Sequence, residues 1–377
     1  MRTMQKQDNP RSVMRDAADT PCWVINGRFL TQQITGVQRY AREIVQNLDE
    51  LLSQNKDIGA RLKLHLVTPG GEVPDMQAIT CRQSNFLSGH LWDQLVLPWY
   101  GGDKILSLGN FGPLAARSHV VCIHDANTFL ESESYSGTFG LVYRSLLPLI
   151  GRRARRVATV SEFSARMLEK FGVCSADKIF IAPNGHEHVL RWDLRLAKLP
   201  MLKEISRPYV LLLGSKAKHK NIGVILDGAG ALDAAGLDIV VVGASSKIFA
   251  DDTVKTETPN VRYTGYVGDN ELAALYAGAL CLCFPSKTEG FGIPLLEAMT
   301  SGCPVISSNA ASLTEVGGDA ALYVPPDDSK GWIDCIIALS KDHNLRTSLI
   351  VKGRQRAVFF SWKKSAQIYL HELLNLR

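Results

Sequence analysis

The segment 284–305 constrains the fold more than any other part of the sequence, because it combines a strand end, a glycine turn and a helix start. The apolar run 279–285 predicts a buried strand, and Gly290 and Gly292 after it allow a tight backbone turn. Segment 294–301 then predicts a helix, since it begins with a proline and is followed by a glycine. The free N–H groups and the positive dipole end of such a helix attract anions, so the segment predicts a phosphate site beyond the strand.

Two glutamates flank this predicted phosphate site. Glu289 precedes the helix in the turn, and Glu297 lies about one turn inside the helix. Carboxylates do not bind phosphate but accept hydrogen bonds from hydroxyl groups, so a ligand with a phosphate centre and hydroxyl-rich groups on both sides fits the pattern. A nucleoside diphosphate sugar has this layout. The alternative for each glutamate alone is structural: Glu297 complements the helix dipole, and Glu289 is a solvated loop residue.

The string Glu-Gly-Phe-Gly-Ile-Pro-Leu-Leu-Glu, from Glu289 to Glu297, resembles the signature of the family 4 glycosyltransferases, which are retaining enzymes. The resemblance implies the α/β GT-B fold, in which two Rossmann-like domains face a central cleft and a C-terminal helix crosses back to the first domain. It implies that Glu289 contacts the donor sugar and that Glu297 holds the ribose hydroxyls. The residues between them that it assigns to the donor are Gly290, Phe291, Gly292, Ile293 and Leu295.

The rest of the chain predicts alternating strands and helices, a pattern typical of parallel sheets that helices cover. Strands are predicted at 23–26, 62–68, 104–108, 119–124, 156–161, 178–182, 209–213, 239–242, 261–266, 280–284, 304–307 and 322–324. We expect a loose extension over residues 1–20 and an acceptor-side domain over residues 21–200. A nucleotide-sugar domain is expected over 201–360, and a helix returning to the first domain over 361–377.

Two further donor contacts are predicted in the first half of the chain. His124 ends a predicted strand, where open α/β sheets place ligand contacts, although a lone histidine there is as often a satisfied polar residue. The resemblance implies that His124 faces the donor sugar. Gly36 begins the first helix and leaves room near the backbone for a phosphate or an acceptor, with a simple helix cap as the alternative.

The loop after the strand 209–213 carries a cluster of lysines that would neutralise a diphosphate. Lys220 matches the family's phosphate lysine. The family often adds an arginine nearby, and the residues that stand in its place are Ser215, Lys216 and Lys218. Because the sequence has no Asp-x-Asp pair, we expect lysines and the helix start to stabilise the leaving charge without a metal or other cofactor.

The excess positive charge lies in the first half of the chain, where residues 1–200 hold 24 Lys and Arg against 19 Asp and Glu. Four arginines follow the apolar run 146–150: Arg152, Arg153, Arg155 and Arg156. A solvated helix end and a patch that contacts a membrane surface or a pyrophosphate are equally open interpretations. Arg28 and Arg39, which follow the first strand, are also expected on the acceptor or membrane side.

Together these patterns predict a transferase that moves a hexose from a nucleoside diphosphate sugar to a glycan, for which a lipid-linked oligosaccharide is expected. The string Thr-Gly-Val-Gln-Arg-Tyr is similar to one branch of bacterial polysaccharide glycosyltransferases, so GDP-mannose is the first expectation, and UDP-hexose and dTDP-rhamnose are alternatives. A sugar-nucleotide hydrolase or epimerase of the same fold and a non-catalytic binding partner remain open. No nucleic-acid partner is expected. The sequence has no secretory signal and no Cys-x-x-Cys pair, so a cytoplasmic protein is expected, with peripheral contact at the inner membrane face as a further possibility.

Overall fold

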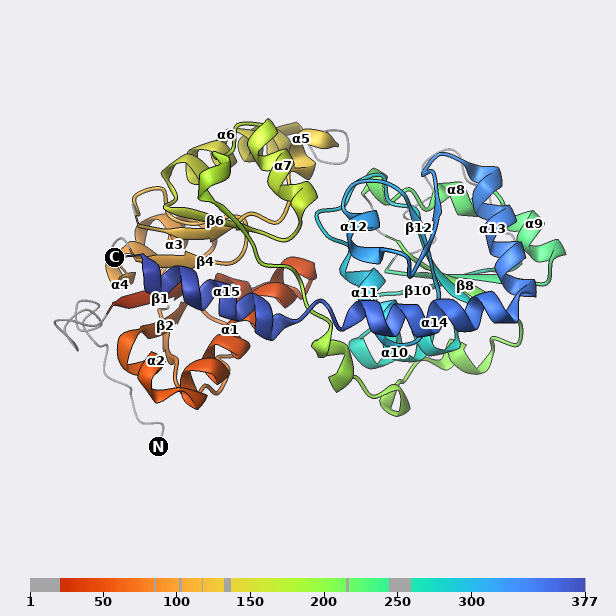
Figure 1. Ribbon diagram of the computed structural model, residues 1–377, viewed down its shortest axis with the longest axis horizontal. Helices are drawn as coiled ribbons and strands as arrows, with labels where there is room; N and C mark the ends of the chain where they lie inside the picture. The colour runs from red at the N-terminus through yellow and green to blue at the C-terminus, as the bar shows by residue number, and fades with distance from the viewer. Residues whose placement is uncertain are drawn as a thin grey trace.

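The computed structural model describes residues 21–84, 86–101, 104–116, 118–131, 137–214, 217–243 and 259–376. Within these residues the chain forms two α/β halves that lie side by side, each built on a parallel sheet (Figure 1). The expected extension over residues 1–20 and the donor candidates Ser215 and Lys216 lie outside the described residues.

The first half contains a parallel sheet of seven strands in the order β3-β2-β1-β4-β5-β6-β7. These strands are β1 (Cys22–Asn26), β2 (Lys63–Thr68), β3 (Thr80–Gln83), β4 (Ile105–Ser107), β5 (Val120–Cys122), β6 (Arg156–Thr159) and β7 (Ile179–Ile181). Its helices are α1 (Gly36–Gln54), α2 (Lys56–Arg61), α3 (Gly89–Leu95), α4 (Leu97–Gly101), α5 (Asn127–Leu130), α6 (Gly137–Arg153) and α7 (Glu162–Lys170). In β1, Trp23 and Ile25 pack in the core cluster that contains α1, whereas Val24 packs with Trp92 of α3. Since side chains alternate along a strand, both faces of this sheet are buried.

The second half repeats this plan with six parallel strands in the order β10-β9-β8-β11-β12-β13. These strands are β8 (Tyr209–Leu213), β9 (Asp238–Val242), β10 (Val261–Gly265), β11 (Cys281–Phe284), β12 (Val305–Ser308) and β13 (Leu322–Val324). Its helices are α8 (Gly223–Leu226), α9 (Ala229–Ala234), α10 (Asp269–Gly278), α11 (Ile293–Thr300), α12 (Leu313–Gly317), α13 (Ser329–Lys341) and α14 (His343–Ala357). Ligands of such sheets bind beyond the carboxyl ends of the strands, which is where the turn between β11 and α11 lies.

The chain passes between the halves twice. The first passage runs through the short 3-10 turns η5 (Glu187–Arg191), η6 (Leu194–Leu196) and η7 (Pro200–Lys203). The second follows α14 and enters α15 (Trp362–Asn375), which packs along α1 of the first half (Figure 1). The hydroxyl groups of Tyr40 in α1 and Tyr369 in α15 form a hydrogen bond of 3.0 Å, and Arg156 forms an ion pair with Glu372 of α15 at 2.8 Å. The C-terminal helix is therefore part of the first half's core.

The α/β architecture with two parallel sheets and a returning helix is confirmed. All twelve strands predicted from the sequence are present, each within two residues of its predicted bounds. The strand β3 was not predicted, because its sequence Thr-Cys-Arg-Gln has no apolar run and it lies half-exposed at the edge of the sheet.

Candidate active site

The glycine turn, residues 285–292 between β11 and α11, lies against the end of β5 in the first half. A Cβ atom on Gly290 would lie 2.7 Å from the carbonyl oxygen of His124, so glycine alone permits this approach. Gly292 has a φ of 98°, which a side chain strongly disfavours. At the other end of the contact, a Cβ on Gly36 would lie 3.3 Å from the side chain of Ile293. Two of the predicted donor glycines, Gly36 and Gly290, therefore mark the place where the two halves meet.

Serine hydroxyls bind the carbonyl oxygens of the glycine turn. From its own half, Ser312 Oγ lies 2.9 Å from the carbonyl of Glu289 and 3.0 Å from that of Phe291. No described residue accepts a hydrogen bond from the N–H groups of Gly290 or Phe291. The carbonyl oxygens of the turn are therefore occupied, while the N–H groups of Gly290 and Phe291 are available for a ligand.

The first half binds the middle carbonyl of the same turn. Ser161 Oγ donates to the carbonyl of Gly290 at 2.6 Å, and Ser164 Oγ lies 3.0 Å from the same oxygen. Both serines are 1% exposed. Ser161 also caps α7 by accepting the N–H of Ser164 at 3.0 Å. Glu315 of the second half completes the contact, because its carboxylate accepts the N–H of Glu162 at 2.8 Å at the start of α7.

Lys220 and Glu289, the predicted phosphate and sugar contacts, form one ion pair with Nζ and Oε1 2.7 Å apart. Lys220 Nζ also lies 5.4 Å from the ring centre of Phe284, which ends β11. Asn221 fixes the backbone after the lysine, because it has a left-handed φ of 54° and its amide donates to two carbonyl oxygens of the second half. The pKa of the Asp125 carboxyl group is raised, chiefly by burial and further by the nearby charge of Glu289. The positive charge of Lys220 acts in the opposite direction.

His124 is buried beside the glycine turn. Its Nε2 lies 2.9 Å from the carbonyl oxygen of Leu108, which can only accept, so Nε2 carries the hydrogen. Its ring packs edge-on against Tyr40 of α1, with ring centres 4.8 Å apart. Burial lowers the pKa of His124 to about 4, so the imidazole is neutral at pH 7.

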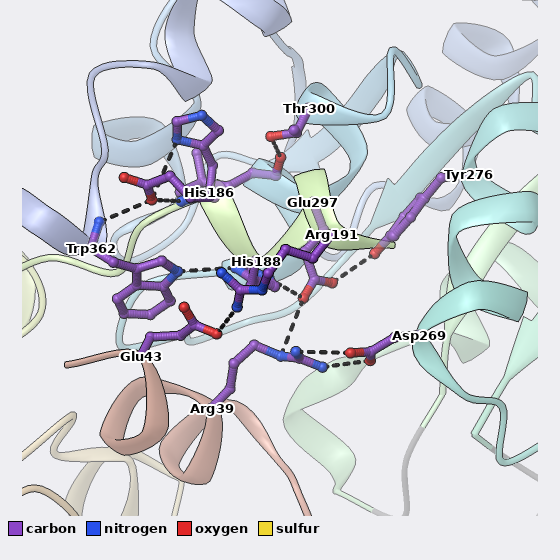
Figure 2. Close-up of polar contacts among 12 residues, drawn as sticks. Arg39, Glu43, His186, His188, Arg191, Asp269, Tyr276, Glu297, Thr300 and Trp362 are labelled. Atoms are coloured by element: carbon purple, nitrogen blue, oxygen red, sulfur yellow. Dashed lines mark hydrogen bonds and ion pairs between the residues drawn. The ribbon is translucent and has the colours of Figure 1, made fainter. Parts of the chain in front are cut away.

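Glu297 lies at the centre of a buried polar network (Figure 2). His188 Nε2 lies 3.2 Å from its Oε1, and the hydroxyl of Tyr276 donates to its Oε2 at 3.2 Å. Burial, together with the charge of Glu297, raises the pKa of Tyr276 well above its ordinary value, so the phenol stays a donor. The carboxylate is thereby held in one orientation from two sides.

Arg39, which was expected on the acceptor or membrane side, reaches from α1 to the second half. Its guanidinium binds Asp269 of α10 through contacts of 2.6 and 3.1 Å, and its Nε lies 4.0 Å from Glu297 (Figure 2). The cation also lies 5.5 Å from the ring centre of Trp192. Arg39 is therefore an interdomain contact at the edge of the Glu297 network.

Other predicted residues also differ in their surroundings. Arg28 binds the fully buried Asp93 at 2.8 Å, which leaves it little surface for a membrane contact. Leu295 is fully buried and its N–H bonds the carbonyl of Gly292 at 3.0 Å, so it is a packing residue. Phe291 is likewise buried, against Phe360.

The arginine cluster divides into two parts. Arg152, Arg153 and Arg155 are exposed at the end of α6. Arg156 is not available to a surface partner, because its guanidinium binds Glu372 of α15 and lies 5.6 Å from the ring centre of Phe180. The same helix also exposes three apolar side chains, namely Leu141, Val142 and Leu149, of which Leu149 lies one turn before Arg152 and Arg153.

Several residues of this site were not predicted from the sequence. Asp125 carried a signal, since it follows His124 at the end of a strand. The segment 161–164 resembles a family landmark, and Ser161 is expected from the sequence as a helix cap, but neither Ser161 nor Ser164 was assigned to the site. His188 was missed. Only the fold brings these residues to Gly290 and Glu297, across 109 to 129 residues of sequence. No local pattern indicates such a contact.

Residues 207–342 match the family model described as Glycosyl transferases group 1. The second half of the chain therefore carries a domain that matches this family. O-antigen chain mannosyltransferase RfbU of Salmonella typhimurium is 29% identical over 326 residues, which is 83% of this chain and 89% of that protein. O-antigen chain mannosyltransferase B of Escherichia coli is 31% identical over 222 residues, which is 56% of this chain and 58% of that protein.

A solved structure shares the fold of this chain. Sucrose-phosphate synthase from Thermosynechococcus elongatus superposes with a TM-score of 0.69 over 94% of this chain and 99% of that chain, at 17% identity. The chain therefore has the GT-B fold, as the sequence resemblance implied.

Two further observations concern metals and membranes. Within the described ranges, no group of three or more His, Cys, Asp or Glu side chains is arranged to hold a metal ion. Over the same ranges, no helix has both the length and the apolar character that a bilayer crossing requires. Metal independence and membrane contact both stay predictions.

Proposed function

We propose that this glycosyltransferase moves a hexose from a nucleoside diphosphate sugar to a glycan acceptor, with retention of anomeric configuration and without a metal. One observation carries the proposal. The glycine turn has its carbonyl oxygens bound by serines, while the N–H groups of Gly290 and Phe291 have no partner among the described residues. Free N–H groups next to a helix start bind phosphate, and a glutamate stands on either side to bind hydroxyl groups.

The two glutamates then have different tasks. Oε1 of Glu297 accepts one hydrogen bond from His188, and Oε2 accepts one from Tyr276. Each oxygen can accept a second hydrogen bond, so the carboxylate can receive two ribose hydroxyls. Glu289 holds the sugar. Its partner Lys220 stabilises the negative charge that grows on the departing diphosphate, which is the type of interaction that lowers a transition-state barrier most.

His124 supports the sugar side of this arrangement as a neutral group. Its pKa of about 4 excludes the imidazolium as a partner of the diphosphate at pH 7. The carbonyl of His124 touches the turn at Gly290, so the residue helps to place Glu289 beside the sugar. Retention of configuration follows from the family resemblance.

GDP-mannose is the proposed donor, and surface polysaccharide synthesis at the cytoplasmic face of the membrane is the proposed setting. Two relatives that align with this chain are named O-antigen chain mannosyltransferases, which supports both parts. A UDP-hexose and dTDP-rhamnose are the alternative donors.

The proposed acceptor is a glycan, best represented by a lipid-linked oligosaccharide. A cavity of about 560 Å³ lies beside α1 in the first half, a volume in the usual range for ligand sites. Its wall combines apolar Phe29 and Met76 with polar Arg42, Gln46 and Glu50. Such a mixture suits sugar rings, which have apolar faces and hydroxyl edges.

A nucleotide-sugar screen followed by a transfer assay tests the proposal. GDP-mannose, UDP-glucose and dTDP-rhamnose are compared by thermal shift, since a ligand at 100 times its Kd stabilises by roughly 2.7 kcal/mol. Transfer with the best donor is then measured with excess EDTA present. Stabilisation by none of the three overturns the donor site, and loss of transfer in EDTA with rescue by magnesium overturns metal independence. Sugar release to water without any acceptor would identify a hydrolase instead, and tight binding without turnover a binding partner.

A further inference from the structure

The two chain passages between the halves meet next to Glu297, on the side of its Oε1 atom. His188 comes from η5 in the first passage, and Trp362 begins α15 at the end of the second. Glu187 ties the passages together, because its carboxylate accepts the N–H of Trp362 at 3.0 Å and the hydroxyl of Ser361 at 2.5 Å. The two connecting segments are therefore joined to each other next to the Glu297 carboxylate.

The hydrogen bonds at this junction determine the tautomer of His188 (Figure 2). Trp362 Nε1 lies 3.1 Å from His188 Nδ1, and an indole N–H can only donate. His188 Nδ1 is therefore the acceptor, and Nε2 carries the hydrogen. This Nε2 lies 3.2 Å from Glu297 Oε1, so the imidazole donates to the carboxylate.

Because its members are buried, this chain of hydrogen bonds is what fixes the Oε1 atom of the Glu297 carboxylate. Trp362 is 0% exposed, His188 1% and Glu297 5%. At this depth water cannot replace a lost donor, and an unmade hydrogen bond to a charged group is expensive. The other oxygen is held by Tyr276, which belongs to the second half alone.

We propose that His188, fixed in its tautomer by Trp362, is a positioning residue that orients Glu297 toward the ribose of the nucleotide. This inference rests on the proposed function, in which Glu297 receives the ribose hydroxyls. Neither His188 nor Trp362 needs to touch the ligand. Their effect is to hold the free acceptor positions of Glu297 at the place of the 2′- and 3′-hydroxyls, so that the enzyme distinguishes ribose from 2′-deoxyribose.

The probes are GDP and 2′-deoxy-GDP, whose affinities are measured by calorimetry for each variant. Trp362→Phe keeps an aromatic ring but removes the N–H that fixes His188, and His188→Leu removes the donor to Glu297. Trp332→Phe is the matched control, because Trp332 is also 0% exposed and its Nε1 makes one hydrogen bond of 3.0 Å, to Pro325. The ratio of the two affinities cancels any general loss of stability.

The wild type is expected to bind GDP about 10-fold more tightly than 2′-deoxy-GDP, as for one hydrogen bond to a charged group. Trp362→Phe and His188→Leu are expected to reduce this preference to less than about 3-fold, and Trp332→Phe to retain it. A full preference in Trp362→Phe overturns the inference while leaving the donor site intact. Failure of the wild type to bind either nucleotide overturns the proposed function itself.

A measurement on the wild type makes the inference independent of any variant's folding. Nitrogen NMR of the labelled protein distinguishes a ring nitrogen that carries hydrogen from one that accepts it. The hydrogen of His188 is expected on Nε2, both without nucleotide and with GDP bound. A hydrogen on Nδ1, or a doubly protonated ring at pH 7, contradicts the proposed orientation.

Discussion

Lys220 and Glu289 form an ion pair at the glycine turn, with Nζ 2.7 Å from Oε1. The lysine side chain is 26% exposed and the glutamate side chain 11%, so a ligand can reach the lysine while the carboxylate stays largely sheltered. A bound diphosphate therefore competes with Glu289 for the ammonium group. In the absence of a ligand, the ion pair holds both side chains at the turn.

The first prediction separates the two members of this pair. Glu289→Gln should lower kcat far more than it changes KM for the donor, because the sugar it contacts changes in the transition state. Lys220→Ala should lower kcat/KM by roughly 100- to 1,000-fold, as for the loss of one stabilising donor at a developing charge. Steady-state kinetics with varied donor measures both. Equal kcat in Glu289→Gln and the wild type would exclude the glutamate from the sugar site.

The second prediction concerns nucleotide affinity. Glu297→Gln should weaken nucleoside diphosphate binding by about 1.5 to 3 kcal/mol, or roughly 10- to 150-fold, since an amide accepts ribose hydroxyls less strongly than a carboxylate. Calorimetry with GDP measures the change. Glu315→Gln is the comparison variant, because Glu315 binds the first half through α7 and is not part of the nucleotide site. An unchanged affinity in Glu297→Gln would remove the residue from the ribose.

The third prediction addresses the contact that joins the halves at the turn. Ser164→Ala removes a buried hydroxyl that lies 3.0 Å from the carbonyls of both Gly290 and His124, and alanine suits the helix. Turnover should fall by about 5- to 10-fold, the value of one hydrogen bond, while GDP affinity changes little. Ser145→Ala is the control, because Ser145 is an exposed helical serine that bonds its own helix. Identical turnover in both variants would contradict a role for Ser164 in holding the turn.

The fourth prediction is a loss of stability in mild acid. Burial lowers the pKa of His119 and of His124 to about 4, below the ordinary value of 6.5 that applies in the unfolded chain. Between pH 6.5 and pH 4, these two histidines therefore bind protons in the unfolded state but not in the folded state. The free energy of unfolding should fall by about 1.4 kcal/mol per pH unit for each histidine as the pH drops from 6.5 towards 4.

Urea unfolding at pH 7, 6 and 5 measures this slope. His119→Leu should reduce this slope by about 1.4 kcal/mol per pH unit, because the contribution of that imidazole is gone. His343→Leu, a substitution at an exposed histidine of α14, should leave the slope unchanged. A slope that does not differ between the two variants would mean that His119 is not responsible.

The fold was predictable because its information is local. A central strand of a parallel sheet is a short apolar run with both faces buried, and β8, β9 and β11 carry this signal, whereas β3 at the sheet edge does not. The glycine turn was predictable for the same reason, since Gly290, Gly292 and both glutamates fall within nine residues.

The partners of these residues were not predictable, because they come from distant parts of the chain. Arg39 reaches Asp269 across 230 residues, and His188 reaches Glu297 across 109. Arg39 was assigned to a surface from its position after the first strand. Its true partner depends on how α1 and α10 lie across the two halves, which no short pattern records.

The last prediction concerns the exposed end of α6. Arg152, Arg153 and Arg155 are exposed at the end of α6, a helix that also exposes apolar side chains, and this combination attracts anionic lipid surfaces. Each basic residue near such a surface contributes on the order of 1 kcal/mol, so three of them should give binding that high salt releases. Arg156 is left intact in the test, because it holds α15 through Glu372.

Flotation with anionic and neutral liposomes at low and high salt measures this binding. The variant that carries Gln at 152, 153 and 155 is compared with one that carries Gln at Lys56, Arg61 and Lys63, three exposed basic residues around α2. Both variants lose the same charge, so a difference between them reports the position of the charge rather than its amount. Salt-sensitive binding to anionic vesicles that only the first variant loses would support a membrane contact at α6. Equal binding by the two variants would make these arginines a solvated helix end, whose positive charge simply complements the helix dipole.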